Sequence, residues 1–193
     1  MGIFDFLKSN KEKNSKRIKE KIQIKKFEKR QYIWMDQVEE ICSKEETRKV
    51  INCHTLFYTQ LKVNVFTLLA PVNLKDEKKL RIFYTHKFTI GYLFGFLFAV
   101  LQSEEFMRHK EKELMKILMI ALMQDLFDFT KDSAEKISNS ISSKDPEFYD
   151  NENFKAGLVT GGREWIQFVK DEFRGIIGNN FAEKINEFKK DFA

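Results

Sequence analysis

Apolar residues recur every three or four positions along nearly the whole chain, the spacing that places them on one face of an α-helix. Up to about Cys42, one such stripe consists of Ile24, Phe27, Trp34, Val38 and Ile41. The next stripe consists of Val50, His54, Phe57, Leu61, Val65 and Leu68. No segment shows a convincing alternation of apolar and polar residues, the pattern of a half-buried strand. The pattern therefore predicts amphipathic helices throughout.

Helix-start and helix-stop signals divide this pattern into separate helices. Ser43 and Glu46 have the Ser-x-x-Glu form of a capping box, in which each side chain satisfies the backbone N–H of the other, so a helix is predicted to begin there. Pro71 ends that helix, because proline lacks the N–H that a helix interior needs. Capping residues and apolar runs then predict a buried central pair of helices at about 74–102 and 104–130.

The second half of the chain contains a polar interruption followed by two further helices. Residues 131–153 are rich in serine and include Asp145 and Pro146, a cap followed by proline at the first helical position. We therefore expect a loop or irregular turn in this stretch. A fifth helix is predicted from about Phe154 onward, and a last one after Gly178.

Composition favours a single helical domain. Of the 193 residues, 42% are hydrophobic, which is enough for one sizeable core. Only 2 are Pro and 8 are Gly, and this shortage of chain-breaking residues suits long helices better than a turn-rich β-sandwich. The 20 Phe residues indicate a bulky aromatic core. We predict an all-α, single-domain bundle of about five or six long amphipathic helices.

Two predicted helices share the pattern Phe-x-x-Gly-x-x-x-Gly, one with Gly91 and Gly95 and the other with Gly157 and Gly161. Glycines four positions apart lie on one helix face and allow another backbone to approach closely. Each costs about 1 kcal/mol of helix propensity relative to alanine, which indicates a packing role at close helix crossings. Whether the match reflects a duplication stays open, because so short a pattern also recurs by chance.

All of the excess positive charge lies near the N-terminus. Residues 1–30 contain 11 basic and 4 acidic residues, a net charge of +7, whereas the whole chain carries +5 and residues 31–193 therefore sum to −2. We expect residues 1–20 to form a basic tail or helix extension and residues 21–193 to form the bundle domain. The candidates for binding an anionic surface are Lys8, Lys11, Lys13, Lys16, Arg17, Lys19, Lys21, Lys25 and Lys26.

Three interpretations of this basic segment stay open. On anionic lipid, each basic residue near the surface contributes about 1 kcal/mol, and the apolar Ile3, Phe4, Phe6 and Leu7 would insert beside it. On nucleic acid, the same charges would release counterions without reading sequence, although no aromatic residue interleaves the basic run before Phe27. The third interpretation is a solvated helix or tail.

Met115, Met119 and Met123 recur every four residues and form a stripe of flexible apolar side chains. Such stripes line adaptable apolar grooves, and they also fill cores. The three methionines are therefore candidates for an apolar groove or a ligand cavity between the central helices.

The sequence offers no positive sign of catalysis. It contains no dinucleotide-binding, P-loop, nucleophile-elbow or zinc-protease motif, so we lean against an enzyme and expect no cofactor. His54, His86 and His109 lie in different predicted elements, and no metal site is expected. Cys42 and Cys53 show neither metal-binding nor disulfide spacing, as is typical of a protein in a reducing cytoplasm.

The most apolar stretch runs from Phe88 to Leu101. As a helix it would reach only about 21 Å, against about 30 Å for the hydrocarbon core of a bilayer, so we predict a buried helix. Together these features predict a cytoplasmic, non-catalytic helical protein that binds an unidentified protein partner through an apolar groove or its basic N-terminal helix. The alternatives are a peripheral protein at the inner face of the membrane or an apolar-ligand carrier, and a nonspecific nucleic-acid binder.

Overall fold

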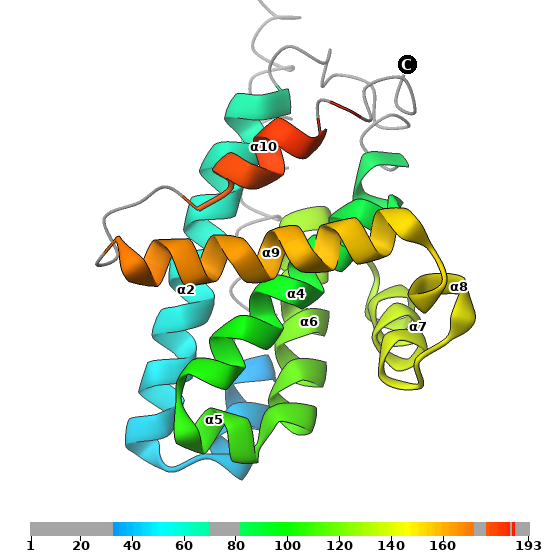
Figure 1. Cartoon of the computed structure of the whole chain (residues 1–193). Coiled ribbons are helices and arrows are strands. Elements are labelled where there is room, and N and C mark those ends of the chain that lie inside the picture. The colour runs from blue at the N-terminus through cyan, green and yellow to red at the C-terminus, as the bar shows by residue number, and fades with distance from the viewer. Residues whose placement is uncertain (1–32, 70–81, 172–176, 186, 188–193) are drawn as a thin grey trace, which may run out of the picture.

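A computed structural model describes residues 33–69, 82–171, 177–185 and 187. Helices make up 88% of these residues and no strand occurs among them (Figure 1), which confirms the predicted all-α fold. The helices are α2 (Lys44–Leu69), α4 (Lys87–Ser103), α5 (Glu105–His109), α6 (Glu111–Phe127), α7 (Lys131–Ser142), α8 (Pro146–Tyr149), α9 (Glu152–Lys170) and α10 (Asn179–Ile185). Residues 33–41 and 82–85 are helical as well.

Helix α2 begins where the capping box predicts. The backbone N–H of Ser43 donates to Oε2 of Glu46 at 2.7 Å, and the N–H of Glu46 donates to Oγ of Ser43 at 3.4 Å. The predicted apolar stripe of α2 is buried as far as Leu61. Val65 and Leu68, the last two residues of that stripe, lie outside the described side chains.

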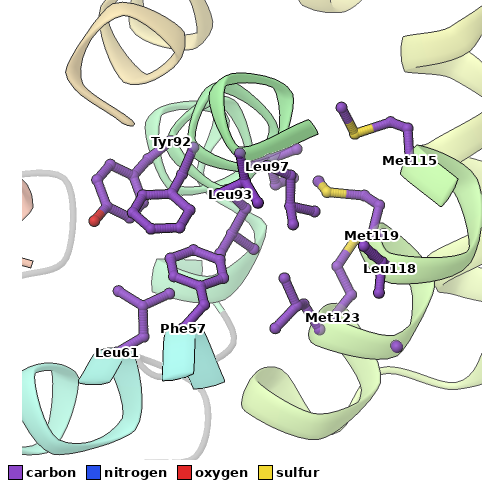
Figure 2. Close-up of a cluster of buried hydrophobic side chains, with 14 of the residues drawn as sticks. Phe57, Leu61, Tyr92, Leu93, Leu97, Met115, Leu118, Met119 and Met123 are labelled. Atoms are coloured by element: carbon purple, nitrogen blue, oxygen red, sulfur yellow. The ribbon is translucent and has the colours of Figure 1, made fainter. Parts of the chain in front are cut away.

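Helices α2, α4 and α6 enclose the main core (Figure 2). Phe57 of α2 stacks on Phe96 of α4 with ring centroids 3.8 Å apart, and stacked rings add to the stabilisation that apolar burial supplies. Leu93 and Leu97 of α4 lie between this aromatic cluster and the apolar side of α6. The predicted central pair is therefore buried.

Both helices of the central pair are shorter than the apolar pattern predicts. The helical residues 82–85 end at His86, whose Nδ1 accepts the N–H of Phe88 and so caps the start of α4. The second helix of the pair divides into α5 and α6 around Lys110, whose ammonium lies 2.7 Å from Oε2 of Glu46. The hydrogen bond from Lys110 lowers the pKa of Glu46 to about 2, with help from the backbone N–H of the capping box.

The predicted loop at residues 131–153 is wrong for its first part, which forms helix α7. The side chain of Thr130 accepts a backbone N–H of the first turn and caps the helix. Ala134, Ser138 and Ile141 form the buried face. Helix α7 packs beside α6. Two of its three buried residues are small, so its buried face does not stand out as an apolar stripe in this serine-rich sequence.

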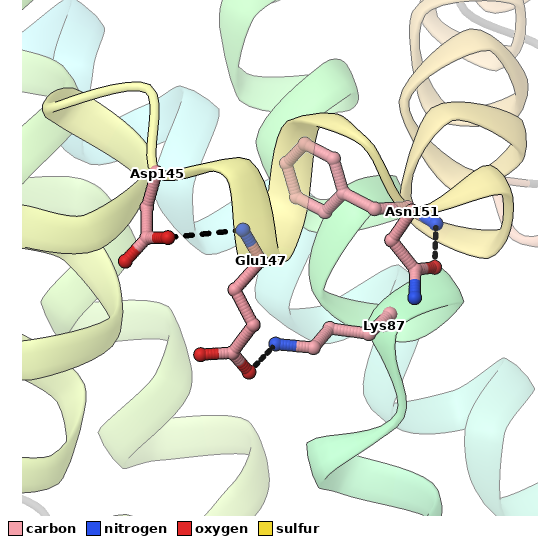
Figure 3. Close-up of polar contacts among 5 residues, drawn as sticks. Lys87, Asp145, Glu147 and Asn151 are labelled. Atoms are coloured by element: carbon pink, nitrogen blue, oxygen red, sulfur yellow. Dashed lines mark hydrogen bonds and ion pairs between the residues drawn. The ribbon is translucent and has the colours of Figure 1, made fainter.

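Contacts at the start of α8 and α9 fix these helices beside the start of α4 (Figure 3). Oδ1 of Asp145 accepts the N–H of Glu147 at 2.9 Å, as expected for a helix cap. The carboxylate of Glu147 forms an ion pair with the ammonium of Lys87, the first residue of α4. Oδ1 of Asn151 then accepts a first-turn N–H of α9 at 3.1 Å.

The most extensive helix contact joins α4 and α9, which cross in Figure 1. A Cβ added to Gly91 would lie 2.2 Å from the carbonyl O of Phe154, and a Cβ added to Gly157 would lie 2.2 Å from the carbonyl O of Phe88. Both distances are far below van der Waals contact. Only glycine therefore permits the two backbones to approach so closely.

The same reciprocal contact repeats one turn further along both helices. A Cβ on Gly95 would lie 2.0 Å from the carbonyl O of Leu158, and a Cβ on Gly161 would lie 2.1 Å from the carbonyl O of Tyr92. The glycines of the two sequence motifs thus face each other across one helix crossing. This contact makes α9, rather than α6, the closest partner of α4.

Candidate interaction surface

Helix α10 covers one flank of the α4–α9 crossing. Phe181 packs on Tyr92 and Phe88, with ring centroids 4.6 and 5.7 Å apart. The buried carboxylate of Glu164 on α9 accepts the hydroxyl of Tyr92 at 2.6 Å and the backbone N–H of Gly178 at 2.6 Å. This carboxylate therefore connects the start of α10 to both crossing helices.

Glu164 serves a structural purpose. Burial raises its pKa, while hydrogen bonds from Tyr92 and from the backbone N–H groups of Gly178 and Asn180 act in the opposite direction. A carboxylate at a helix N-terminus satisfies N–H groups that have no partner within the helix. Glu164 was not predicted from the sequence, although an acidic residue within the apolar face of a predicted helix is a usable signal of such a role.

Helices α4 and α9 also carry exposed apolar side chains. Phe98 of α4 is 41% exposed, and Val159, Ile166 and Val169 of α9 are 46%, 51% and 40% exposed. Leu158, next to them on α9, is partly buried. Val159, Ile166 and Val169 are seven and three positions apart, which places them on one side of α9, and we call these three residues the open face.

Helical spacing places the open face on the side of α9 that points away from α4. A Cβ on Gly95 would meet the backbone of Leu158, and a Cβ on Gly162 would lie 3.7 Å from the carbonyl O of Gly95. Ile166 lies nine positions after Gly157, and Val159 lies two positions after it, so both are on the side of α9 opposite the glycines that meet α4. Their exposure shows that no described part of the chain covers them.

The other exposed large hydrophobic residues of the described chain do not form such a group. Ile33, Val63 and Ile82 lie on three different elements: the helical residues 33–41, helix α2 and the helical residues 82–85. Single exposed apolar residues are common on protein surfaces, whereas a contiguous group marks a binding surface. The open face is therefore the best candidate functional site.

Basic residues border the open face on α9. Arg163 and Lys170 are exposed and lie one turn before and one turn after Ile166, on the same side of the helix. Lys155, nearer the start of the helix, forms an ion pair with Glu152 at 2.7 Å. The border of the open face near Ile166 is therefore positively charged.

The three methionines predicted for an apolar groove lie in the core. Met115, Met119 and Met123 are 7%, 1% and 0% exposed. Figure 2 shows them on the α6 side of the core, across from Leu93 and Leu97. They fill the space between α4 and α6 and therefore do not line an exposed groove. The basic candidates from Lys8 to Lys26 lie outside the described residues.

A second buried ionisable group, His54 on α2, packs among core side chains. Its Nε2 lies 3.8 Å from Oδ2 of Asp125 on α6, beyond hydrogen-bond distance, and both side chains are 1% exposed. The ring of Trp34 lies against it with centroids 4.3 Å apart. Burial lowers the pKa of His54 to about 4, so the imidazole is neutral at neutral pH. These contacts indicate a core role.

Within the described residues, no group of three or more His, Cys, Asp and Glu side chains could hold a metal ion. Glu105 and His109 do approach to 3.8 Å, but they are 87% and 74% exposed on a helix surface. Among the helices described, none combines the length and the apolar character that crossing a membrane requires.

The fold and the surface define a helical protein built around a glycine-mediated helix crossing, with exposed apolar side chains on the outer side of α9. We found no protein family, no curated protein and no solved structure that matches the chain. A functional assignment therefore has to come from its own residues.

Proposed function

We propose that this protein is a non-catalytic interaction protein that binds a protein partner through its open face. The observation that carries this proposal is the row of exposed Val159, Ile166 and Val169 on α9, a helix that its close backbone contact with α4 holds in place. A surface held in place before binding loses little conformational entropy when a partner covers it. Burial of its apolar side chains then contributes to affinity.

The roles of the buried ionisable groups support action by binding rather than by catalysis. Strongly shifted pKa values often mark active sites. Here the carboxylate of Glu164 holds the start of α10, and the neutral imidazole of His54 packs on Trp34. Both groups thus have a structural explanation.

We place the protein in the cytoplasm as part of this proposal. Cys42 and Cys53 are free thiols, and burial raises the pKa of each, so both stay protonated and unreactive. Peripheral attachment to the inner face of the membrane and nonspecific binding of nucleic acid are alternative proposals, and both depend on the basic residues between 8 and 30.

Site-specific photo-cross-linking tests the proposal. The photoreactive residue p-benzoylphenylalanine replaces Ile166 in the full-length protein, expressed in the cells that normally produce it. The matched control replaces Val63, which is 58% exposed on α2. We expect a discrete protein adduct from position 166 that does not form from position 63. The same adducts from both positions, or none from position 166, would contradict the proposal.

A further inference from the structure

Helix α10 is attached to the bundle through one aromatic side chain. Phe181 is the only buried residue among the described side chains of α10, at 2% exposure. Its ring centroid lies 4.6 Å from that of Tyr92 and 5.7 Å from that of Phe88. The ring of Phe83, at 5.9 Å, lies against it as well. A helix of seven residues is not stable without such contacts, so the position of α10 depends on this anchor.

The second attachment involves the backbone of α10 rather than its side chains. Oε1 of Glu164 accepts the N–H of Gly178 at 2.6 Å and the N–H of Asn180 at 3.2 Å. Every residue except proline offers such an N–H group. The site therefore fits any helix start that carries an aromatic residue in its first turn. We call the residues that hold α10 the socket: Phe83, Phe88, Tyr92 and Glu164.

The rest of the core does not depend on α10. Helices α4 and α9 meet backbone to backbone at their glycines, and Phe57 of α2 stacks on Phe96 of α4. These contacts do not involve α10, so they remain when it leaves. Departure of α10 also returns the carboxylate of Glu164 to water, and the recovered hydration offsets part of the lost apolar burial. Opening of α10 should therefore cost less free energy than global unfolding.

We infer that α10 opens as a unit and that the socket then binds a helix start of another protein, one that carries an aromatic residue in its first turn. Helix α10 is thus an autoinhibitory cover, and it displays the chemistry that the socket accepts. The socket is separate from the open face, because Glu164 and Ile166 lie two positions apart and point to opposite sides of α9. The inference therefore goes beyond the proposed function and does not rest on it.

Hydrogen exchange of the wild-type protein, measured residue by residue, tests the opening. The N–H of Ala182 donates to the carbonyl O of Gly178 at 2.8 Å, so it is protected while α10 is in place. We expect this amide to be protected at least about tenfold less than the amides of Leu93 and Leu97 in α4. Equal protection of all three would show that α10 opens only when the whole protein unfolds, and the inference would be wrong.

Binding of a peptide tests the socket. A fluorescent peptide has the sequence of residues 177–187, and full-length Phe181→Ala provides a protein whose own α10 no longer fills the socket. In the wild type, α10 competes with the peptide at the high effective concentration of a tethered segment. We expect Phe181→Ala to bind the peptide at least about tenfold more tightly than the wild type does. A peptide with Ala in place of its Phe should bind neither protein.

Two double variants locate the bound peptide. Phe83→Ala, added to Phe181→Ala, removes one ring of the socket and should weaken peptide binding at least about tenfold. Ile166→Ala, added to Phe181→Ala, removes a side chain of the open face and should leave peptide binding unchanged. Thermal melts show whether each protein is folded, and the hydrogen-exchange test needs no variant.

Several results would overturn the inference. They are the absence of peptide binding to folded Phe181→Ala, equal binding by this variant and the wild type, or loss of binding on Ile166→Ala. A wild-type dimer in sedimentation that Phe181→Ala dissociates would give the socket to α10 of a second copy and overturn its assignment to another protein. The cross-link from position 166 tests the open face separately, so the proposed function stands or falls independently of these results.

Discussion

The hydroxyl of Tyr92 lies 2.6 Å from Oε2 of Glu164, which joins two buried side chains that are 72 residues apart in the sequence. Tyr92 comes from the point where α4 touches α9, and the same carboxylate accepts the N–H of Gly178 before α10. One buried acid therefore holds three helices together.

Removal of the hydroxyl should weaken the fold. Tyr92→Phe leaves a buried carboxylate without one of its donors, and hydrogen bonds to charged groups contribute about 1.5–3 kcal/mol. We expect the free energy of unfolding, measured by urea denaturation, to fall by about this amount. A double-mutant cycle with Glu164→Gln isolates the pair. A Tyr92→Phe variant as stable as the wild type would show that the contact does not stabilise the fold.

The pKa of Glu164 predicts a particular pH dependence of stability. Burial raises the pKa of this carboxyl in the folded state, so between its ordinary value of about 4.3 and the raised value the folded state binds more protons than the unfolded state. Stability from this group should therefore fall as pH rises through that window. Denaturation of Glu164→Gln at several pH values should lack this contribution.

His54 should act in the opposite direction. Burial lowers its pKa to about 4, from about 6.5 in the unfolded state, so the unfolded state binds more protons between these values. Stability should fall as pH decreases from about 6.5 to about 4, by on the order of 3 kcal/mol. The variant His54→Gln should lose this dependence. If His54→Gln lost as much stability as the wild type over this pH range, other groups would be the cause.

Local sequence signals predicted local structure well. The capping box of Ser43 and Glu46 and the cap at Asp145 both occur as expected, because each depends on groups only two or three residues apart. Helix α7 was missed because Ala134 and Ser138 form much of its buried face, and small or polar residues do not register in an apolar pattern.

Helix pairing could not be predicted from the pattern. A stripe of apolar residues shows which side of a helix is buried but not which other helix covers it. The glycines of α4 and α9 indicated close contacts, yet the structure was needed to show that they face each other. The open face was missed for a related reason: Val159, Ile166 and Val169 recur at helical spacing, but the spacing alone does not show that this side of α9 is exposed.

The division between residues 1–20 and the rest of the chain is a prediction from sequence alone. In residues 8–21, Ile18 is the sole hydrophobic residue, and such a stretch buries too little to offset the entropy of ordering it. A protein that starts at Lys21 should therefore melt within a few degrees of the full-length protein. Unfolding or aggregation of the shortened protein would show that the segment is part of the bundle.

The glycines at the crossing offer the most direct test of the fold. A Cβ at Gly95 would lie 2.0 Å from a backbone carbonyl O, so α4 and α9 would have to move apart to accommodate even alanine. Overpacking typically costs about 1–3 kcal/mol, and Gly95→Leu should cost more than Gly95→Ala. Gly161→Ala should behave like Gly95→Ala, because its Cβ would lie 2.1 Å from the carbonyl O of Tyr92.

Gly162 is the matched control, since it adjoins Gly161 in the same helix but its Cβ would lie 3.7 Å from the nearest atom, which is ordinary van der Waals contact. Gly162→Ala should therefore gain up to about 1 kcal/mol, the helix propensity that glycine lacks. Urea denaturation of all four variants distinguishes the two effects. If Gly95→Ala and Gly162→Ala changed the free energy of unfolding in the same direction, the crossing would not depend on glycine.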